Sequence, residues 1–320
     1  MSVNWHPTAS IQVLKERARI LKSIRAFFVE RNVMEVETPV ISPAAITDPQ
    51  LESFSTKFNQ QEFYLHTSPE FYMKRLLVAG SGDIYQLEKV FRDDENGRYH
   101  NPEFTMLEWY RLGFNHHQLM DEMEELLTVL MAENNVNFKR ISYQQAFINQ
   151  LEIDPFEVNL KQLKQCAEKF NIEIPQGMND DKDMWLDWFM VDKIAPNFSK
   201  ECFTFLYDYP ASQASLARLD NDDSRKANRF ELFYGELELA NGFYELTDAD
   251  EQAKRFDNDN AVRKQRGQKL MPVDECFLDA LKSGLPECSG VAIGVDRLMM
   301  LITGADHINK VISFGDEFSG

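Results

Sequence analysis

Residues 90–110, VFRDDENGRYHNPEFTMLEWY, decide the fold of this chain. They predict a strand that carries an arginine, a polar loop of about ten residues, and a return strand rich in aromatic residues. Arg98 and His100 lie in the loop, and Phe104 begins the return strand. A guanidinium group can bind phosphate oxygens through paired hydrogen bonds, and a flat ring can stack on a base. The hairpin therefore predicts a site for a nucleoside triphosphate; the alternative is a plain hairpin with a long charged loop.

Helices and strands are predicted on both sides of this hairpin. Apolar residues recur at three- or four-residue spacing after Ser10, which can cap a helix over 11–31. Further helices are expected over 69–79, 116–133, 249–266 and 274–283, and strands over 63–66, 84–91, 103–110, 203–209, 229–239 and from residue 290 onward. Strands separated by long connections, with one clear hairpin, indicate an α+β fold.

Residues 142–200 differ from the rest in composition. They are mostly polar and helical in pattern, with breaks at Pro155, Pro175, Gly177 and Pro196. We interpret this segment as an insertion between strands of the core. The chain is long enough to bury a substantial core, so we expect a single domain over residues 1–320 that includes the insertion.

The charge and composition restrict the class of protein. The formal net charge is −18, from 52 acidic and 34 basic residues, which disfavours nucleic acid as a partner because phosphates require lysine and arginine. The sequence contains no run of about 18 apolar residues, so no membrane span is predicted. The start, MSVNWHPTAS, lacks the pattern of a secretory signal, so we expect a cytoplasmic protein. The four cysteines are scattered, which indicates reduced thiols rather than a zinc site.

Two further segments agree with the hairpin in sequence order. Residues 28–39, FVERNVMEVETP, predict a helix that runs into an extended segment ending at Pro39, and residues 290–301, GVAIGVDRLMML, predict a strand that turns into a helix carrying Arg297. Each is weak alone, since glycines also suit packed core strands and an acid at a helix start is commonly a cap. Together the three segments resemble the three motifs of class II aminoacyl-tRNA synthetases, in the lysyl branch.

The resemblance implies a class II catalytic core, with an antiparallel sheet of about six strands flanked by helices, and a homodimer formed through the segment that ends at Pro39. It also implies activation of an amino acid by ATP, with Arg92 and Arg297 as catalytic residues on the phosphates. Mg²⁺ would be held by Glu238, with Glu245 as a second candidate. The residues implied at the ATP site are Arg92, Asp93, Asp94, His100, Asn101, Phe104, Glu238, Leu239, Gly294 and Arg297.

The same resemblance implies a pocket for a lysine-like substrate. A cationic substrate requires carboxylates that stay ionised in a closed pocket. Two residues depart from the synthetase pattern: Ala292 replaces a glycine, and Ser68 replaces an alanine, which together predict a substrate near α-lysine with a displaced amino group. Asp94 stands where the motif has glutamate and has a shorter reach. The residues implied at the pocket are Ser68, Pro69, Glu70, Tyr110, Asn241, Glu245 and Ala292.

The segments SYQQAF (142–147), YPASQASLA (209–217) and NGFYELTDA extend the resemblance to truncated bacterial paralogues of lysyl-tRNA synthetase that modify translation elongation factor P. The first core helix begins near residue 11, so no anticodon-binding domain is expected before it. The implied reaction transfers (R)-β-lysine to a lysine ε-amine of elongation factor P, and no tRNA is expected as acceptor. Two alternatives remain: a minimal lysyl-tRNA synthetase, which the charge disfavours, and a silent regulator, which the presence of Arg92 and Arg297 disfavours.

Overall fold

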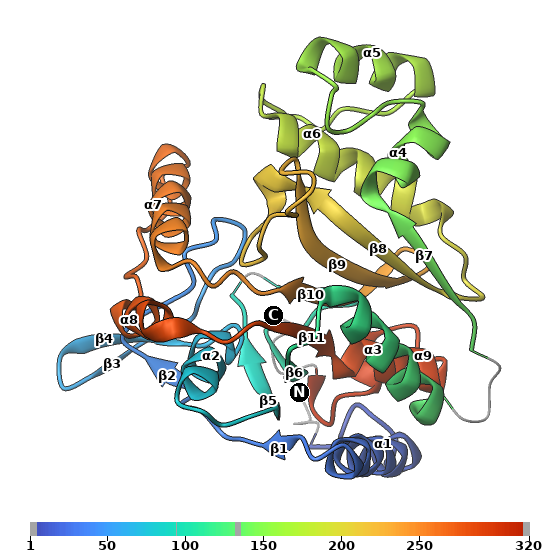
Figure 1. Cartoon of the computed structure of the whole chain (residues 1–320). Coiled ribbons are helices and arrows are strands. Elements are labelled where there is room, and N and C mark those ends of the chain that lie inside the picture. The colour runs from blue at the N-terminus through green and yellow to red at the C-terminus, as the bar shows by residue number, and fades with distance from the viewer. Residues whose placement is uncertain (1–4, 94, 132–135, 316–320) are drawn as a thin grey trace.

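A large mixed sheet organises the fold (Figure 1). The computed structural model describes residues 5–93, 95–131 and 136–315, and in this part eight strands join in the order β1-β5-β6-β11-β10-β9-β8-β7. The six inner strands are antiparallel, whereas β1 and β7 pair in parallel at the two edges. The expected antiparallel core is therefore confirmed, with one parallel strand added at each edge. The strands are β1 (Met34–Glu35), β5 (Ile84–Phe91), β6 (Glu103–Leu112), β7 (Phe138–Ser142), β8 (Phe203–Pro210), β9 (Lys226–Tyr234), β10 (Leu237–Tyr244) and β11 (Cys288–Gly294).

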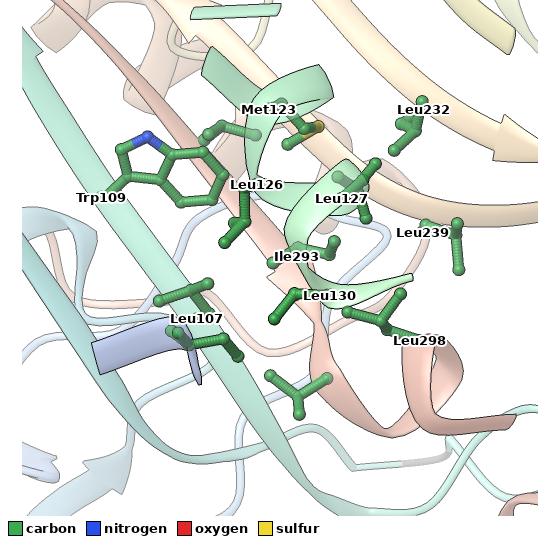
Figure 2. Packing of buried hydrophobic residues seen from close by; sticks show 14 of the residues in the cluster. Leu107, Trp109, Met123, Leu126, Leu127, Leu130, Leu232, Leu239, Ile293 and Leu298 are labelled. Carbon is green, nitrogen blue, oxygen red and sulfur yellow. The ribbon is translucent and has the colours of Figure 1, made fainter. Parts of the chain in front are cut away.

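One face of the sheet carries the main hydrophobic core. Side chains alternate between the faces of a strand, so Leu107 and Trp109 of β6 share a face with Ile293 of β11 and Leu232 of β9. Figure 2 shows these residues packed against Met123, Leu126 and Leu130. The helices whose apolar stripes cover this face are α1 (Ile11–Glu30), α3 (His116–Leu130) and α9 (Val295–Thr303).

The opposite face is partly covered by three further helices. Ile84 of β5 and Tyr110 of β6 join a separate hydrophobic cluster with residues of α2 (Glu70–Val78), α7 (Ala249–Gln265) and α8 (Glu275–Gly284). A small antiparallel sheet in the order β2-β4-β3 is also present, with β2 (Ile41–Ser42), β3 (Ser55–Phe58) and β4 (Gln61–Leu65). The rest of this face remains available for a site.

The segment expected to be helical, residues 142–200, supplies most of a second hydrophobic cluster, which also includes Leu206, Tyr209 and Phe233 of β8 and β9. It contains α4 (Tyr143–Leu151), α5 (Leu160–Phe170), α6 (Lys182–Phe189), a π-helical turn η1 (Met190–Ile194) and a 3₁₀ turn η2 (Ala195–Asn197). Side chains of Ser142, Asn159 and Asp181 accept hydrogen bonds from the first-turn amides and so define where the three helices begin. Figure 1 shows these helices beyond β7, β8 and β9.

Some predicted elements were wrong or missed. The single strand expected over 229–239 is two strands, β9 and β10, which turn at Gly235, whose φ of 57° suits glycine. The short strands β2, β3 and β7 were not predicted, and within the extended segment expected to end at Pro39 the structure has the two-residue strand β1. The helix expected over 116–133 ends at Leu130, and residues 132 and 133 lie outside the described part. No described helix combines the length and apolar character needed to cross a membrane.

Candidate active site

The register of the central strands gathers polar residues on the face opposite the main core. Glu108 of β6 lies beside Ala292 of β11, which lies beside Asn241 of β10, which lies beside Glu231 of β9. The next row along the strands is Tyr110, Gly290, Phe243 and Arg229. Glycine is required at residue 290, because a Cβ there would lie 2.2 Å from the Tyr110 ring and 2.7 Å from Glu245 Oε1.

A cavity of about 1130 Å³ covers this face. Ten of the predicted site residues line it: Arg92, His100, Asn101, Phe104, Glu238, Leu239, Asn241, Ala292, Gly294 and Arg297. Ser68, Pro69, Glu70, Tyr110 and Glu245 are not among the residues that line it. Asp93 is exposed, and its amide donates to the Glu52 carbonyl at 2.9 Å. Asp94 lies outside the described residues.

Arg297 forms one end of the cavity. Gly294 ends β11 and α9 begins at Val295, which places Arg297 in the first turn of the helix. Its Nη1 donates to the Glu238 carbonyl at 2.7 Å, and its Nη2 lies 2.6 Å from Nε2 of His100. Burial, together with the charge of Arg297, lowers the pKa of His100. A neutral imidazole can accept this hydrogen bond, so the pair holds the guanidinium in place beside the cavity.

Arg92 and Phe104 lie together on the hairpin that the sequence singled out. The Arg92 guanidinium lies 5.1 Å from the centre of the Phe104 ring, and its Nη1 is 3.4 Å from Oε1 of Glu95. Its Nε is buried without a hydrogen-bond partner among the described residues. Asn101 donates to the Glu103 carbonyl at 2.6 Å, which fixes the end of the loop. This arrangement offers a donor and a ring to one ligand.

Two carboxyl groups on β9 and β10 line the same cavity. Burial, with the nearby charge of Glu231, raises the pKa of Glu238 to about 7. Glu231 itself accepts from Arg229 at 2.6 Å and from the Tyr209 hydroxyl at 2.5 Å. Neighbouring carboxylates are the hard oxygen ligands that Mg²⁺ takes together with phosphate. The described residues contain no group of three or more His, Cys, Asp or Glu able to hold a metal, so such an ion would also need oxygens from a substrate.

A cluster of acidic residues lies next to the cavity, and one of them, Glu108 of β6, pairs directly with Ala292 of β11. Lys74 Nζ lies 2.6 Å from Oε1 of Glu70 and 2.5 Å from Oε2 of Glu245. Glu108 accepts from the hydroxyl groups of Ser68 and Tyr110, both at 2.7 Å. Glu245, the second candidate magnesium ligand, is thus placed on Lys74 and is not brought together with Glu238 on the cavity wall.

The protonation of this cluster follows from its contacts. Burial disfavours a charged Lys74, but Glu245 and Glu70 outweigh it and raise the pKa of Lys74 above its ordinary value. Burial, with the charge of Glu70, raises the pKa of Glu108 to about 8. Burial also raises the pKa of Glu245, but its contact with Lys74 favours the ionised form. We therefore assign the cluster's proton to Glu108, because its partners are hydroxyl groups, which can accept a hydrogen bond as well as donate one, rather than a cation.

The loop over residues 46–51 forms another wall of the cavity. Arg263 of α7 is fully buried and donates to the carbonyls of Thr47 at 2.8 Å, Asp48 at 2.7 Å and Leu51, and to Glu52 Oε1 at 3.1 Å. This one side chain therefore holds the loop against α7.

Sequence reasoning missed four charged residues of this region: Lys74, Glu108, Arg229 and Glu231. The spacing of Glu70 and Lys74 by four residues, on a predicted helix, is a signal for the first. Alternation along the predicted strand from Phe104 is a signal for Glu108, since it shares a face with Tyr110. The part played by Arg229 and Glu231 depends on the register of β9, which the sequence did not give.

Comparisons with known proteins agree on one family. Residues 3–317 match the family described as tRNA synthetases class II (D, K and N). Curated relatives named elongation factor P–(R)-β-lysine ligase are 50% identical in Vibrio cholerae, over 97% of each chain, and 49% identical in Vibrio atlanticus, over 98% of each chain. A relative of the same name from Yersinia enterocolitica is 47% identical over 98% of each chain.

Proposed function

The chain belongs to the class II tRNA synthetase family (D, K and N), and we propose that it is an ATP-dependent ligase that joins (R)-β-lysine to a lysine ε-amine of elongation factor P. The observation that carries this proposal is the near-50% identity to ligases of that name along almost the whole of both chains. The cavity supports it, because Arg92 and Arg297, the two arginines expected to bind phosphate, both line it.

The first half-reaction forms an aminoacyl adenylate. The substrate carboxylate attacks the α-phosphorus of ATP, a carboxyl oxygen–phosphorus bond forms, and the bond to the leaving pyrophosphate breaks. Arg92 would stabilise the charge that develops on the α-phosphate, and Arg297 would hold the outer phosphates. The adenine would lie against Phe104, beside the Arg92 guanidinium.

Mg²⁺ is the cation that fits the acidic side of the cavity. Glu238 and Glu231 would supply its protein oxygens, because both line the cavity and the charge of Glu231 raises the cost of ionising Glu238 in the absence of a cation. When bound, the ion would neutralise charge on the phosphates. Arg229, two residues earlier on β9, donates to Glu231 and holds it in place.

The amino acid would extend from Arg92 towards the buried acids. Asn241 and Ala292 line the cavity between the two ends, and Glu70, Glu108 and Glu245 lie beyond them. These carboxylates would bind the ammonium groups of β-lysine, while the methyl group of Ala292 would limit how far the substrate can enter.

The second half-reaction needs a neutral amine. The acceptor ε-ammonium loses a proton, its nitrogen attacks the carbonyl carbon of the adenylate, and AMP leaves as the amide forms. A protein acceptor suits a chain with a net charge of −18 better than tRNA does. We also expect the enzyme to act in the cytoplasm, where ATP and translation factors are present, and to act as a homodimer.

The decisive experiment offers two acceptors side by side. Purified enzyme is given ATP, labelled (R)-β-lysine or labelled α-lysine, and either elongation factor P or bulk tRNA. We expect β-lysine to label elongation factor P, with little label on tRNA. Label on tRNA alone would identify a minimal synthetase, and no adenylate with either lysine would contradict an enzymatic role.

A further inference from the structure

Lys74 lies in a setting that a lysine rarely occupies. Its side chain is only 1% exposed, and Glu70 and Glu245 provide both of its carboxylate contacts. A buried ammonium group costs free energy unless it is paired, and a buried pair is weak evidence of stability because a hydrophobic residue often replaces it without loss. Because Lys74 lies beside the proposed substrate pocket, we consider a role for its charge in substrate binding.

The charges around Lys74 can be counted from every element that packs on it. Glu70 lies on the same helix, Glu108 lies on β6, and Glu245 follows β10. The thiol of Cys288 on β11 is kept neutral, since burial and Glu245 raise its pKa, and α8 places the Phe277 ring 5.9 Å from Lys74 Nζ. Arg218 donates to the Glu245 backbone carbonyl and pairs with the exposed Glu287. When ionised, the three carboxylates and Lys74 carry a net charge of −2.

We propose that Lys74 is a positioning residue: its ammonium group is the fixed counter-ion that holds Glu70 and Glu245, and it leaves the pocket with the charge that an amino acid with two ammonium groups requires. This inference rests on the proposed function. Without Lys74, three carboxylates would face two substrate cations, and one carboxyl group would have to stay protonated.

The contacts of Glu245 indicate how Lys74 fixes the position of its carboxylate. Oε2 forms the ion pair with Lys74, and both carboxylate oxygens, Oε1 included, are buried without a hydrogen bond among the described residues. A buried acceptor without a donor is costly, and a substrate ammonium would satisfy it. The absence of a Cβ at Gly290 leaves room for Oε1, because a methyl group would lie 2.7 Å from it. Lys74 therefore orients Glu245 so that one oxygen is available to the substrate.

The first test compares Lys74→Met with wild type and with Arg75→Met, which removes a cation from the same helix outside the cluster. Amino acid-dependent ATP–pyrophosphate exchange gives KM for (R)-β-lysine and for ATP. We expect Lys74→Met to raise KM for β-lysine roughly tenfold or more with KM for ATP nearly unchanged, because an uncompensated carboxylate is a poor ligand. Lys74→Arg, which keeps the charge, should recover part of the loss. Equal changes in both KM values would indicate a structural role and overturn the inference.

A second variant protects the test against a folding failure. Lys74→Met with Glu70→Gln loses one charge of each sign, so no uncompensated charge is added to the core. It is compared with Glu70→Gln alone, which retains Lys74. The proposal expects KM for β-lysine to be at least severalfold higher in the double variant, because Glu245 is no longer held; equal values would overturn it. If wild type itself fails to activate β-lysine, the proposed function is wrong and the variants are not needed.

Discussion

Arg92 is the residue on which the first half-reaction should depend most. Its guanidinium lines the cavity with Phe104 beneath it, and its buried Nε has no partner among the described residues. Removal of one preorganised contact to a developing charge costs roughly 3 kcal/mol, or a hundredfold or more in rate. We expect Arg92→Ala to reduce ATP–pyrophosphate exchange by at least this factor, with thermal unfolding unchanged. Exchange near the wild-type rate would place Arg92 outside the site.

Ala292 should influence which lysine is used. It lines the cavity between Asn241 and Glu108, so its methyl group occupies space that the substrate could enter. One methyl group in a close-packed pocket is worth roughly 1–3 kcal/mol of discrimination. We expect Ala292→Gly to improve kcat/KM for α-lysine relative to (R)-β-lysine while elongation factor P stays the better acceptor. An unchanged ratio would move attention to Ser68, which donates to Glu108.

Glu108 should make amino acid binding depend on pH. Burial raises its pKa to about 8, so it is mostly protonated near neutral pH in the empty pocket. A cationic substrate favours the carboxylate, so binding should strengthen as pH rises towards about 8 and weaken as pH falls. KM for β-lysine, measured by exchange from about pH 6 to pH 8.5, should fall as pH rises. Glu108→Gln should flatten this dependence, and a flat wild-type profile would contradict the assignment of the proton.

At the scale of single elements, α7 is expected to support the cavity through Arg263. The side chain is fully buried and holds the carbonyls of Thr47, Asp48 and Leu51. Loss of these donors leaves buried acceptors unpaired and should cost roughly 3–5 kcal/mol. We expect Arg263→Met to lower the free energy of unfolding in urea by this amount. The exposed neighbour Lys264, changed to Met, is the control, and a comparable loss in that variant would contradict the clamp.

The elements that could be predicted from sequence are those with strong local signals. The hairpin of β5 and β6 was predicted because its apolar runs are separated by a long polar loop. The hairpin of β9 and β10 was read as one strand, because the turn is so short that only Gly235 and Glu236 interrupt the run of strand-forming residues. The edge strand β7 is held by pairing with β8, a distant segment of the chain, and its own residues carry little local pattern.

The site divides in the same way. The residues on the motif hairpin and on β11, such as Arg92 and Ala292, were found because the order of residues along the chain carries the signal. Lys74 was not predicted as a site residue because its role depends on a contact with Glu245, 171 positions away in the chain. Glu231 was not predicted because its place in the site depends on pairing with Asn241. That pairing follows from a strand register with an irregularity between Glu238 and Ala240, which the sequence does not reveal. Contacts of this kind become visible only when the sheet is assembled.

At the scale of the whole molecule, we expect a two-fold dimer. The segment that resembles the dimer motif, residues 28–39, exposes Val29 at 68% and Met34 at 49%, and the two residues that follow it expose Val40 at 38% and Ile41 at 48%. Such a surface is stabilised when a second copy covers it. Light scattering at micromolar concentration should give a mass of about 74 kDa, twice the 37.2 kDa of one chain. Met34→Glu should shift the mass towards the monomer, whereas a wild-type mass near 37.2 kDa would contradict the dimer.

The two faces of the central sheet can change independently during evolution, because one face carries the proposed site and the other carries the main core. Along β6 and β11, residues 108, 110, 290 and 292 lie on the side of the proposed site, while Leu107, Trp109, Val291 and Ile293 alternate with them in the main core. A mutation that reshapes the ligand side leaves the packing behind it largely untouched. A descendant of such a chain could acquire a different amino acid, or a different acceptor, through a few changes on one face, without first losing and regaining the fold.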